Sequence, residues 1–157
     1  MGASSFGGLL VSSIKACAQY IILACVMASS VRAFANGSLR APTPPHTVEQ
    51  HVEWMYALDV HCSAYWPVFL VLHVLHLLLL PLCLPDSFTA LLVGNSLYAA
   101  AATLYCYYTF RGYLVLPFLR RTTALLYPVV LLSLLFVLSL LFRVHVARAV
   151  VMQQFSL

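Results

Sequence analysis

The sequence has very few charged residues. Asp, Glu, Lys and Arg make up 8% of its 157 residues, and only four of these side chains are acidic. Soluble domains usually carry about 25% charged residues, so this composition excludes an ordinary water-soluble domain. Hydrophobic residues reach 63%. The composition therefore predicts an integral membrane protein whose outer surface faces lipid.

Long basic runs and paired cysteines are also missing. The net charge is +4, but the longest basic run is Arg120-Arg121. A nucleic-acid surface normally needs a clustered basic stripe, so this class of partner is disfavoured. The five cysteines occur singly, which gives neither a zinc knuckle nor a disulfide framework.

Four apolar stretches are long enough to cross a bilayer, because a helix of about 20 residues spans the hydrocarbon core. They cover residues 9–34, 64–84, 88–110 and 122–142. Pro85 predicts a tight turn after the second span and Asp86 a cap for the third, which makes these two spans antiparallel. The predicted fold is a single all-α membrane domain, a bundle of four transmembrane helices.

Two loops join the spans, and we expect each to have local structure. Residues 35–63 begin with a proline-rich extended stretch, and Thr47 with Gln50 matches a capping box. This pair predicts a juxtamembrane helix that begins near Val48. Residues 111–121 read RGYLVLPFLRR, an apolar segment between cations that is too short to span and is expected to lie in the membrane interface.

The arginines predict which side of the membrane these loops occupy. On the side of the two loops lie five cations, Arg32, Arg40, Arg111, Arg120 and Arg121. On the opposite side lie three, Lys15, Arg143 and Arg148. Cations in short loops stay in the cytosol, so both loops are predicted to be cytosolic. Asn36-Gly37-Ser38 is a glycosylation sequon, and a glycan on Asn36 would contradict this topology.

The stretch HVEWMYALDVH, residues 51–61, holds the densest group of chemically active side chains. As a strand it would place His51, Glu53, Asp59 and His61 on one face, as in an acid–base or metal site. As a helix it separates the two carboxylates by roughly 120°. We favour the helix and predict a cytosolic partner-binding surface. Its residues are Glu53, Trp54, Asp59, His61, Arg111, Arg120 and Arg121, with no catalytic or metal-binding residue and no cofactor.

Polar residues inside the spans are the second group of candidates. His73 and His76 lie three apart on the second span, and Gly94 and Asn95 lie on the third. Such residues commonly serve helix packing, with Asn95 bonding across helices. Intramembrane ionisable groups are costly and often functional, so the alternative is a small transporter or metal-handling protein that uses His73, His76 and Asn95.

Several longer motifs resemble a known family. They are VEWMYALDVHCSAYWPVFLVLHVLHL, LLVGNSLYAAAATLYCYYTFRGYLVLPFL and LLYPVVLL, within residues 52–142. In order and spacing they resemble the second half of the uncoordinated-fifty (Unc-fifty) family of Golgi membrane proteins. Members carry an N-terminal region and a further span before the equivalent of Leu9, which this sequence lacks.

The resemblance implies a multi-pass Golgi protein that assists vesicular trafficking and protein transport and is not an enzyme. Fungal relatives associate with guanine-nucleotide exchange factors of Arf GTPases, and animal relatives support surface delivery of a receptor. The expected partners are therefore membrane lipid and, as the resemblance implies, exchange factors and cargo membrane proteins. Some relatives are linked to RNA binding and to the inner nuclear membrane. The expected function is a scaffold or docking site in the Golgi membrane.

Overall fold

The computed structural model describes residues 6–42, 46, 48–83, 85, 87–144, 146 and 150. Within this part the chain is helical and contains no strand. Four helical stretches are long and apolar enough to cross a membrane, Ser13–Leu39, Trp54–Leu78, Phe88–Leu114 and Thr122–Leu141. The predicted all-α membrane fold is confirmed.

Each spanning stretch contains one long α-helix, and three of them add a tighter or wider turn. The elements are α1 (Phe6–Phe34) with η1 (Ala35–Leu39), α2 (Trp54–Phe69) with η2 (Leu70–Leu75) and α3 (His76–Leu78), α4 (Leu80–Cys83), α5 (Phe88–Leu114), and η3 (Thr122–Leu126) with α6 (Tyr127–Leu141). The segments η1 and η2 are π-helical, and η3 is a 3₁₀ helix.

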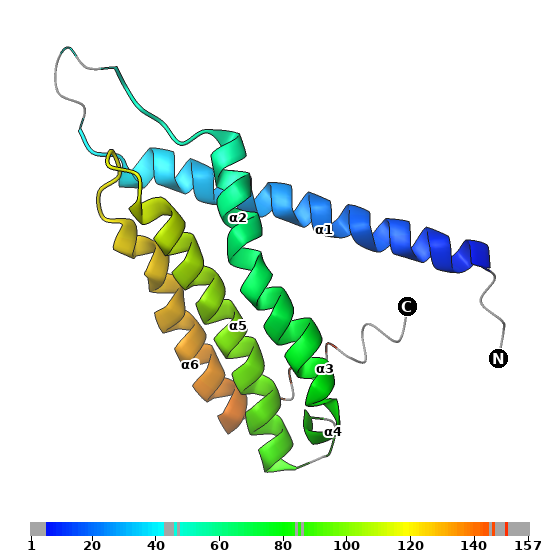
Figure 1. Cartoon of the computed structure of the whole chain (residues 1–157). Coiled ribbons are helices and arrows are strands. Elements are labelled where there is room, and N and C mark those ends of the chain that lie inside the picture. The colour runs from blue at the N-terminus through cyan, green and yellow to red at the C-terminus, as the bar shows by residue number, and fades with distance from the viewer. Residues whose placement is uncertain are drawn as a thin grey trace.

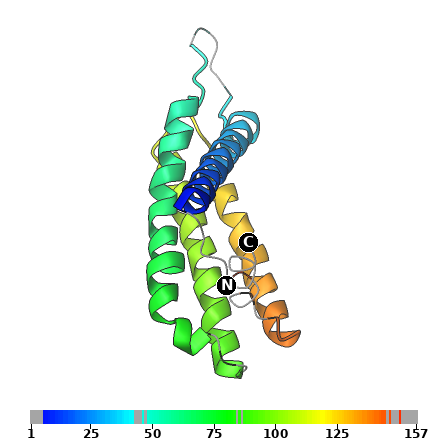
Figure 2. The same cartoon turned by 90° about the vertical axis from the view of Figure 1, so that its right-hand side faces the viewer.

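The helices α2, α5 and α6 lie side by side, with α5 between the other two (Figure 1). Helix α1 crosses this row steeply near one end, and its N-terminal half extends away from the row (Figures 1 and 2). It packs mainly against α2. Three of the four predicted spans thus form a closely packed row, while α1 meets them through its C-terminal part.

Prolines and caps explain where several helices bend or begin. Pro67 lies inside α2 and cannot donate the usual backbone hydrogen bond. The π-helical η2 begins three residues later, at Leu70. Pro128 stands in the first turn of α6, where its missing N–H costs nothing. The hydroxyl of Ser87 caps α5 by accepting from the Ala90 N–H at 3.2 Å. The predicted cap, Asp86, lies outside the described residues.

The predicted start of the helix near Val48 is wrong. Residues 48–53 are not helical, and α2 begins at Trp54 after an extended Glu53. Gln50 is exposed outside the helix, and Thr47 lies outside the described residues. The predicted juxtamembrane helix is instead the first turns of α2, which continue without a break into the second span.

The main core cluster lies at the end of the molecule where the two loops meet. It consists of Ala28, Ala35, Leu39, Val52, Ala57, Val60, Tyr113, Leu119 and Leu125. Away from this end, α6 and the N-terminal half of α1 expose large apolar side chains, as expected for helices that face lipid. The tightly packed end is therefore the part of the fold that can hold side chains in fixed positions.

Candidate functional site

The end of α1 holds the chain that leads into α2 through the backbone of Val52. The Asn36 Oδ1 accepts from the Val52 N–H at 2.7 Å, and its Nδ2 donates to the Val52 carbonyl at 3.1 Å. The Arg32 Nε donates to the same carbonyl at 3.0 Å. Val52 is 1% exposed. Both backbone groups of a buried residue are thus satisfied by side chains, which fixes the direction in which α2 leaves the loop.

The first residue of α2 is fixed in turn. The Trp54 Nε1 donates to the Ser29 hydroxyl of α1 at 3.1 Å, while 37% of the Trp54 surface stays exposed. Glu53 is exposed just before it and Asp59 one and a half turns later. An aromatic ring and two carboxylates are therefore displayed from a backbone that α1 holds in place.

Helices α2 and α5 approach closely at the same end. A Cβ on Gly112 would lie 2.6 Å from Cγ1 of Val60, so only glycine fits there without movement. The Tyr56 hydroxyl donates to the Gly112 carbonyl at 2.6 Å. The Tyr56 ring also meets the Tyr113 ring edge to face, with centroids 6.2 Å apart. This contact fixes the end of α5 against the start of α2.

The second loop is tied to the first by backbone pairing. Arg40 and Leu119 form an isolated antiparallel bridge. The Arg120 N–H donates to the Leu39 carbonyl at 2.6 Å, and the Ala41 N–H donates to the Phe118 carbonyl at 3.0 Å. The Arg40 guanidinium also pairs with Glu49 at 3.1 Å. Both arginine-bearing loops thus lie at one end of the molecule, as the topology prediction requires.

The predicted partner-binding residues separate into an exposed set and a packed one. Six of the seven are exposed, namely Glu53, Trp54, Asp59, Arg111, Arg120 and Arg121. The seventh, His61, is only partly exposed because its Nδ1 lies 2.8 Å from the Tyr105 hydroxyl of α5. Its ring also stacks on Tyr65. His61 therefore serves the contact between α2 and α5 more than the outer surface.

The strand-like alternation of the HVEWMYALDVH stretch does not produce a cluster. His51 and Glu53 are extended and exposed, Asp59 is on an outer face of α2, and His61 faces α5. Among the described residues, no three His, Cys, Asp or Glu side chains come together as metal ligands would. These four side chains are dispersed because His51 and Glu53 precede α2, whereas Asp59 and His61 lie on it.

The two intramembrane histidines lie around the wide turn of η2. His73 stacks on Phe69 with centroids 4.6 Å apart, and His76 meets the edge of Tyr98 at 5.6 Å. Within the described part of the chain, the His73 Nδ1 and the His76 Nε2 are buried and have no hydrogen-bond partner. They contact aromatic neighbours and do not share a polar site with Asn95.

Asn95 holds the end of α6 and the chain after it. Its Nδ2 donates to the Ser139 hydroxyl at 2.9 Å and to the Val144 carbonyl at 2.8 Å. Its Oδ1 accepts from the Val146 N–H at 3.0 Å. Asn95 is 3% exposed, and the neighbouring Gly94 is buried as well. The amide is thus engaged in packing between elements.

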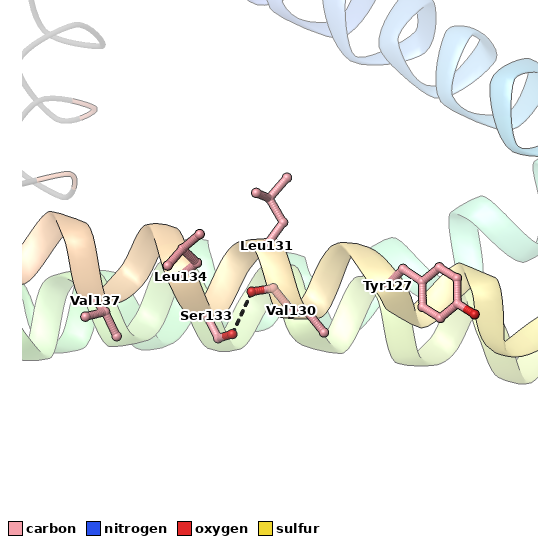
Figure 3. A pocket seen from close by; sticks show the side chains of 6 residues that line it. All are labelled: Tyr127, Val130, Leu131, Ser133, Leu134 and Val137. Carbon is pink, nitrogen blue, oxygen red and sulfur yellow. Dashed lines mark hydrogen bonds between the residues drawn. The ribbon is translucent and has the colours of Figure 1, made fainter.

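A shallow hollow with a mostly apolar lining lies on α6. It measures about 780 Å³ and is lined by Tyr127, Val130, Leu131, Ser133, Leu134 and Val137. The Ser133 hydroxyl is turned back to the Val130 carbonyl, 2.7 Å away (Figure 3). A wall of this kind fits lipid acyl chains, because apart from Tyr127 and Ser133 its lining side chains are aliphatic.

Sequence reasoning missed the residues that build this end of the molecule. From the sequence, Arg32 served only to predict the sidedness of the loops and Asn36 only as part of a glycosylation sequon. In the fold, both side chains bond to the backbone of Val52. A bond between residues 16 or 20 positions apart leaves no periodic signal in one sequence. Gly112 was noticed as part of a motif, but the Val60 contact that demands glycine is visible only in the fold.

The comparisons with known proteins agree with this architecture. The UNC-50 family model matches residues 2–155. The chain belongs to the UNC-50 family. Its relatives include the protein unc-50 homolog of Dictyostelium discoideum, 42% identical over 104 residues, which are 66% of this chain and 40% of that protein.

Other relatives show similar coverage. The protein GMH1 homolog of Schizosaccharomyces pombe is 44% identical over 60% of this chain and 40% of its own length. The human protein unc-50 homolog is 48% identical over 57% of this chain and 35% of its own length. The matches thus span about two-fifths of these relatives. No solved structure matches this chain.

Proposed function

We propose that this UNC-50 family member is a Golgi membrane protein that acts in vesicular trafficking and protein transport. In this proposal it works by recognition and not by catalysis, as a docking site for Arf guanine-nucleotide exchange factors or cargo receptors. Family membership supports a multi-pass membrane protein. The Golgi location and the partners rest on the resemblance described above, which also names the inner nuclear membrane as a second location.

The observation that carries the docking role is the exposure of three residues at the start of α2, Glu53, Trp54 and Asp59, which are called the docking surface below. Trp54 is exposed although its indole N–H is held by Ser29. The two carboxylates are exposed and have no cation within 4.0 Å among the described residues, where the single ion pair is Arg40–Glu49. An aromatic ring on a fixed backbone beside free charges is typical of a recognition surface.

Fixed geometry lowers the cost of binding at this surface. The α1 and η1 side chains that hold Val52 and Trp54 order the start of α2 before a partner arrives. Less conformational entropy is then lost on association. The buried contacts of Val52 thus give the exposed residues their preorganised positions.

The test is capture of a large Arf exchange factor by the full chain in Golgi membranes. Trp54→Ala combined with Asp59→Ala should reduce capture about tenfold or more, because an exposed aromatic hot spot and a charge are removed together. Trp66→Ala is the matched control, since Trp66 is also exposed on α2 but lies twelve residues further along the helix than Trp54. Ser29→Ala removes the indole hydrogen bond and keeps the ring.

Unchanged capture and unchanged Golgi location in the double variant would refute the proposal. Equal losses in the double variant and in Trp66→Ala would also count against it, because the effect would then come from general damage to α2. Ser29→Ala should reduce capture of the exchange factor by a smaller factor, since it affects only the orientation of Trp54.

The alternative, a transporter or metal-handling protein, is favoured by one observation. The His73 Nδ1 and the His76 Nε2 are buried without a hydrogen-bond partner in the described structure. Two histidines are too few for a stable zinc site, and Asn95 is already engaged by α6. Metal analysis of the purified protein separates the two functions, since stoichiometric zinc or iron would support the alternative.

A further inference from the structure

Three exposed arginines lie at the ends of two adjacent spans. Arg111 is in the last turn of α5, and Arg120 and Arg121 come directly before η3. These three residues are called the basic rim. Within the described part of the chain, none has a carboxylate within 4.0 Å. The Arg111 guanidinium lies over the Tyr107 ring, 6.0 Å from its centroid, so three positive charges remain without an anionic partner.

The backbone that carries Arg120 and Arg121 is held firmly. The Arg120 N–H bonds to Leu39, and the preceding Phe118 carbonyl accepts from Ala41. Leu119 and Thr122, on either side of the pair, are 8% and 7% exposed. The two guanidiniums are therefore displayed from a fixed segment, and little backbone entropy is lost when they bind an anion.

Exposed apolar side chains adjoin the rim. Leu114 and Val115 are 54% and 76% exposed, at the point where the span Phe88–Leu114 ends. Arg120 and Arg121 precede the next span, which begins at Thr122. The three arginines thus lie at the ends of two spans, and the exposed Leu114 and Val115 lie between them in the sequence. This is the level at which lipid headgroups meet acyl chains.

We propose that the basic rim binds the anionic headgroup of a phospholipid, with Leu114 and Val115 against its acyl chains. Guanidinium groups donate paired hydrogen bonds to phosphate oxygens, and the planar fork suits that geometry. The exposed side chains of Leu114 and Val115 favour a lipid over an acidic protein. An acidic protein that binds the arginines would leave these two apolar side chains without a partner. The proposal concerns α5 and the second loop, and it does not depend on the docking surface of α2.

Spin-labelled lipids test this in the full chain reconstituted in phosphatidylcholine bilayers. Electron spin resonance measures the fraction of labelled phosphatidylserine and of labelled phosphatidylcholine held at the protein surface. We expect at least about a fivefold preference for phosphatidylserine, since one cation near the surface contributes about this factor. Replacing all three arginines, R111Q with R120Q and R121Q, should bring the preference close to one.

Two control variants separate the rim from net charge. R143Q removes one cation from the opposite end, at a left-handed backbone position like that of Arg121, with φ of 52° against 58°. It should keep the preference. R111K with R120K and R121K retains the charges and should keep most of it, whereas an equal loss in R143Q and the triple Gln variant would refute the rim as the site.

Salt supplies a test that needs no variant. The preference of the unmodified protein should fall as salt rises from low to about 1 M, because screening weakens exposed charges. No preference for phosphatidylserine in the unmodified chain would overturn the proposal. A preference that ignores salt, or that survives in the triple Gln variant, would overturn it as well.

Discussion

The contact between Gly112 and Val60 gives the sharpest prediction about this fold. In Gly112→Ala the new Cβ would lie 2.6 Å from one Val60 methyl carbon and 2.9 Å from the other. Ordinary van der Waals contact begins near 3.4 Å, so the closest pair falls short by about 0.8 Å. Valine is branched at Cβ and has little rotamer freedom in a helix, so its side chain cannot easily turn away.

Relief must therefore come from local separation of α2 and α5. Such overpacking typically costs about 1–3 kcal/mol. Separation also stretches the 2.6 Å bond from the Tyr56 hydroxyl to the Gly112 carbonyl. We expect Gly112→Ala to lose about 1–3 kcal/mol of unfolding free energy, measured by titration of mixed micelles with denaturing detergent and followed by circular dichroism.

The compensating change is Val60→Ala, which removes both methyl carbons that the new Cβ would meet. Each single variant should be destabilised, and the double variant should be more stable than their sum by about 0.5–3 kcal/mol. Ala102→Gly is a matched control on α5, because it changes helix propensity without touching this contact. Wild-type stability in Gly112→Ala, or additive losses in the double variant, would refute the close approach of α2 and α5.

Five further substitutions test the remaining contacts, with the same unfolding measurement. Asn95→Ala should cost about 1–3 kcal/mol, because the Val144 carbonyl, the Val146 N–H and the Ser139 hydroxyl lose their partner, whereas Ser139→Ala removes only one of these bonds and should cost less. Asn36→Ala should cost about 1–3 kcal/mol by leaving the buried Val52 N–H unpaired, and Asn36→Asp should cost less because it keeps that acceptor. Tyr105→Phe should cost about 0.5–1.5 kcal/mol through loss of one hydrogen bond. Equal stability of the paired variants at residue 36 would contradict the assigned roles of the amide.

The spans were predictable because a bilayer imposes a simple length rule on apolar segments. The stretches 88–110 and 122–142 differ from Phe88–Leu114 and Thr122–Leu141 by a few residues at one end. The second span starts ten residues earlier than the predicted residue 64, at Trp54. Its first turns, which contain Asp59, correspond to the predicted juxtamembrane helix. Polar residues there interrupt the apolar run, so the sequence did not show that this helix and the span are continuous.

The start of α2 could not be read from local capping chemistry. A capping box counts only side chains three residues apart, and it predicted a helix from about Val48. In the fold, Arg32 and Asn36 take both backbone groups of Val52, so a helix through Val52 would have to give up these bonds. Tertiary hydrogen bonds outweighed the local preference, and the helix begins two residues later.

The candidate surface was predictable in outline but not residue by residue. Glu53 and Asp59 are both exposed, but only Asp59 lies on the helix, because Glu53 is extended directly before α2. Periodicity alone cannot say which helix face meets α5, so His61 was grouped with the outer residues although its Nδ1 lies 2.8 Å from the Tyr105 hydroxyl. Contacts between residues 44 positions apart depend on helix packing, which composition does not determine.

The sequon at Asn36 links the topology to the packing of α2. The Nδ2 atom of Asn36, which would carry a glycan, donates to the Val52 carbonyl, and Asn36 is only partly exposed. A glycan replaces one of the two hydrogens of Nδ2, so it would place a sugar directly beside this contact at the start of α2. A glycan on Asn36 would contradict the predicted topology, because a sequon is used only in the lumen.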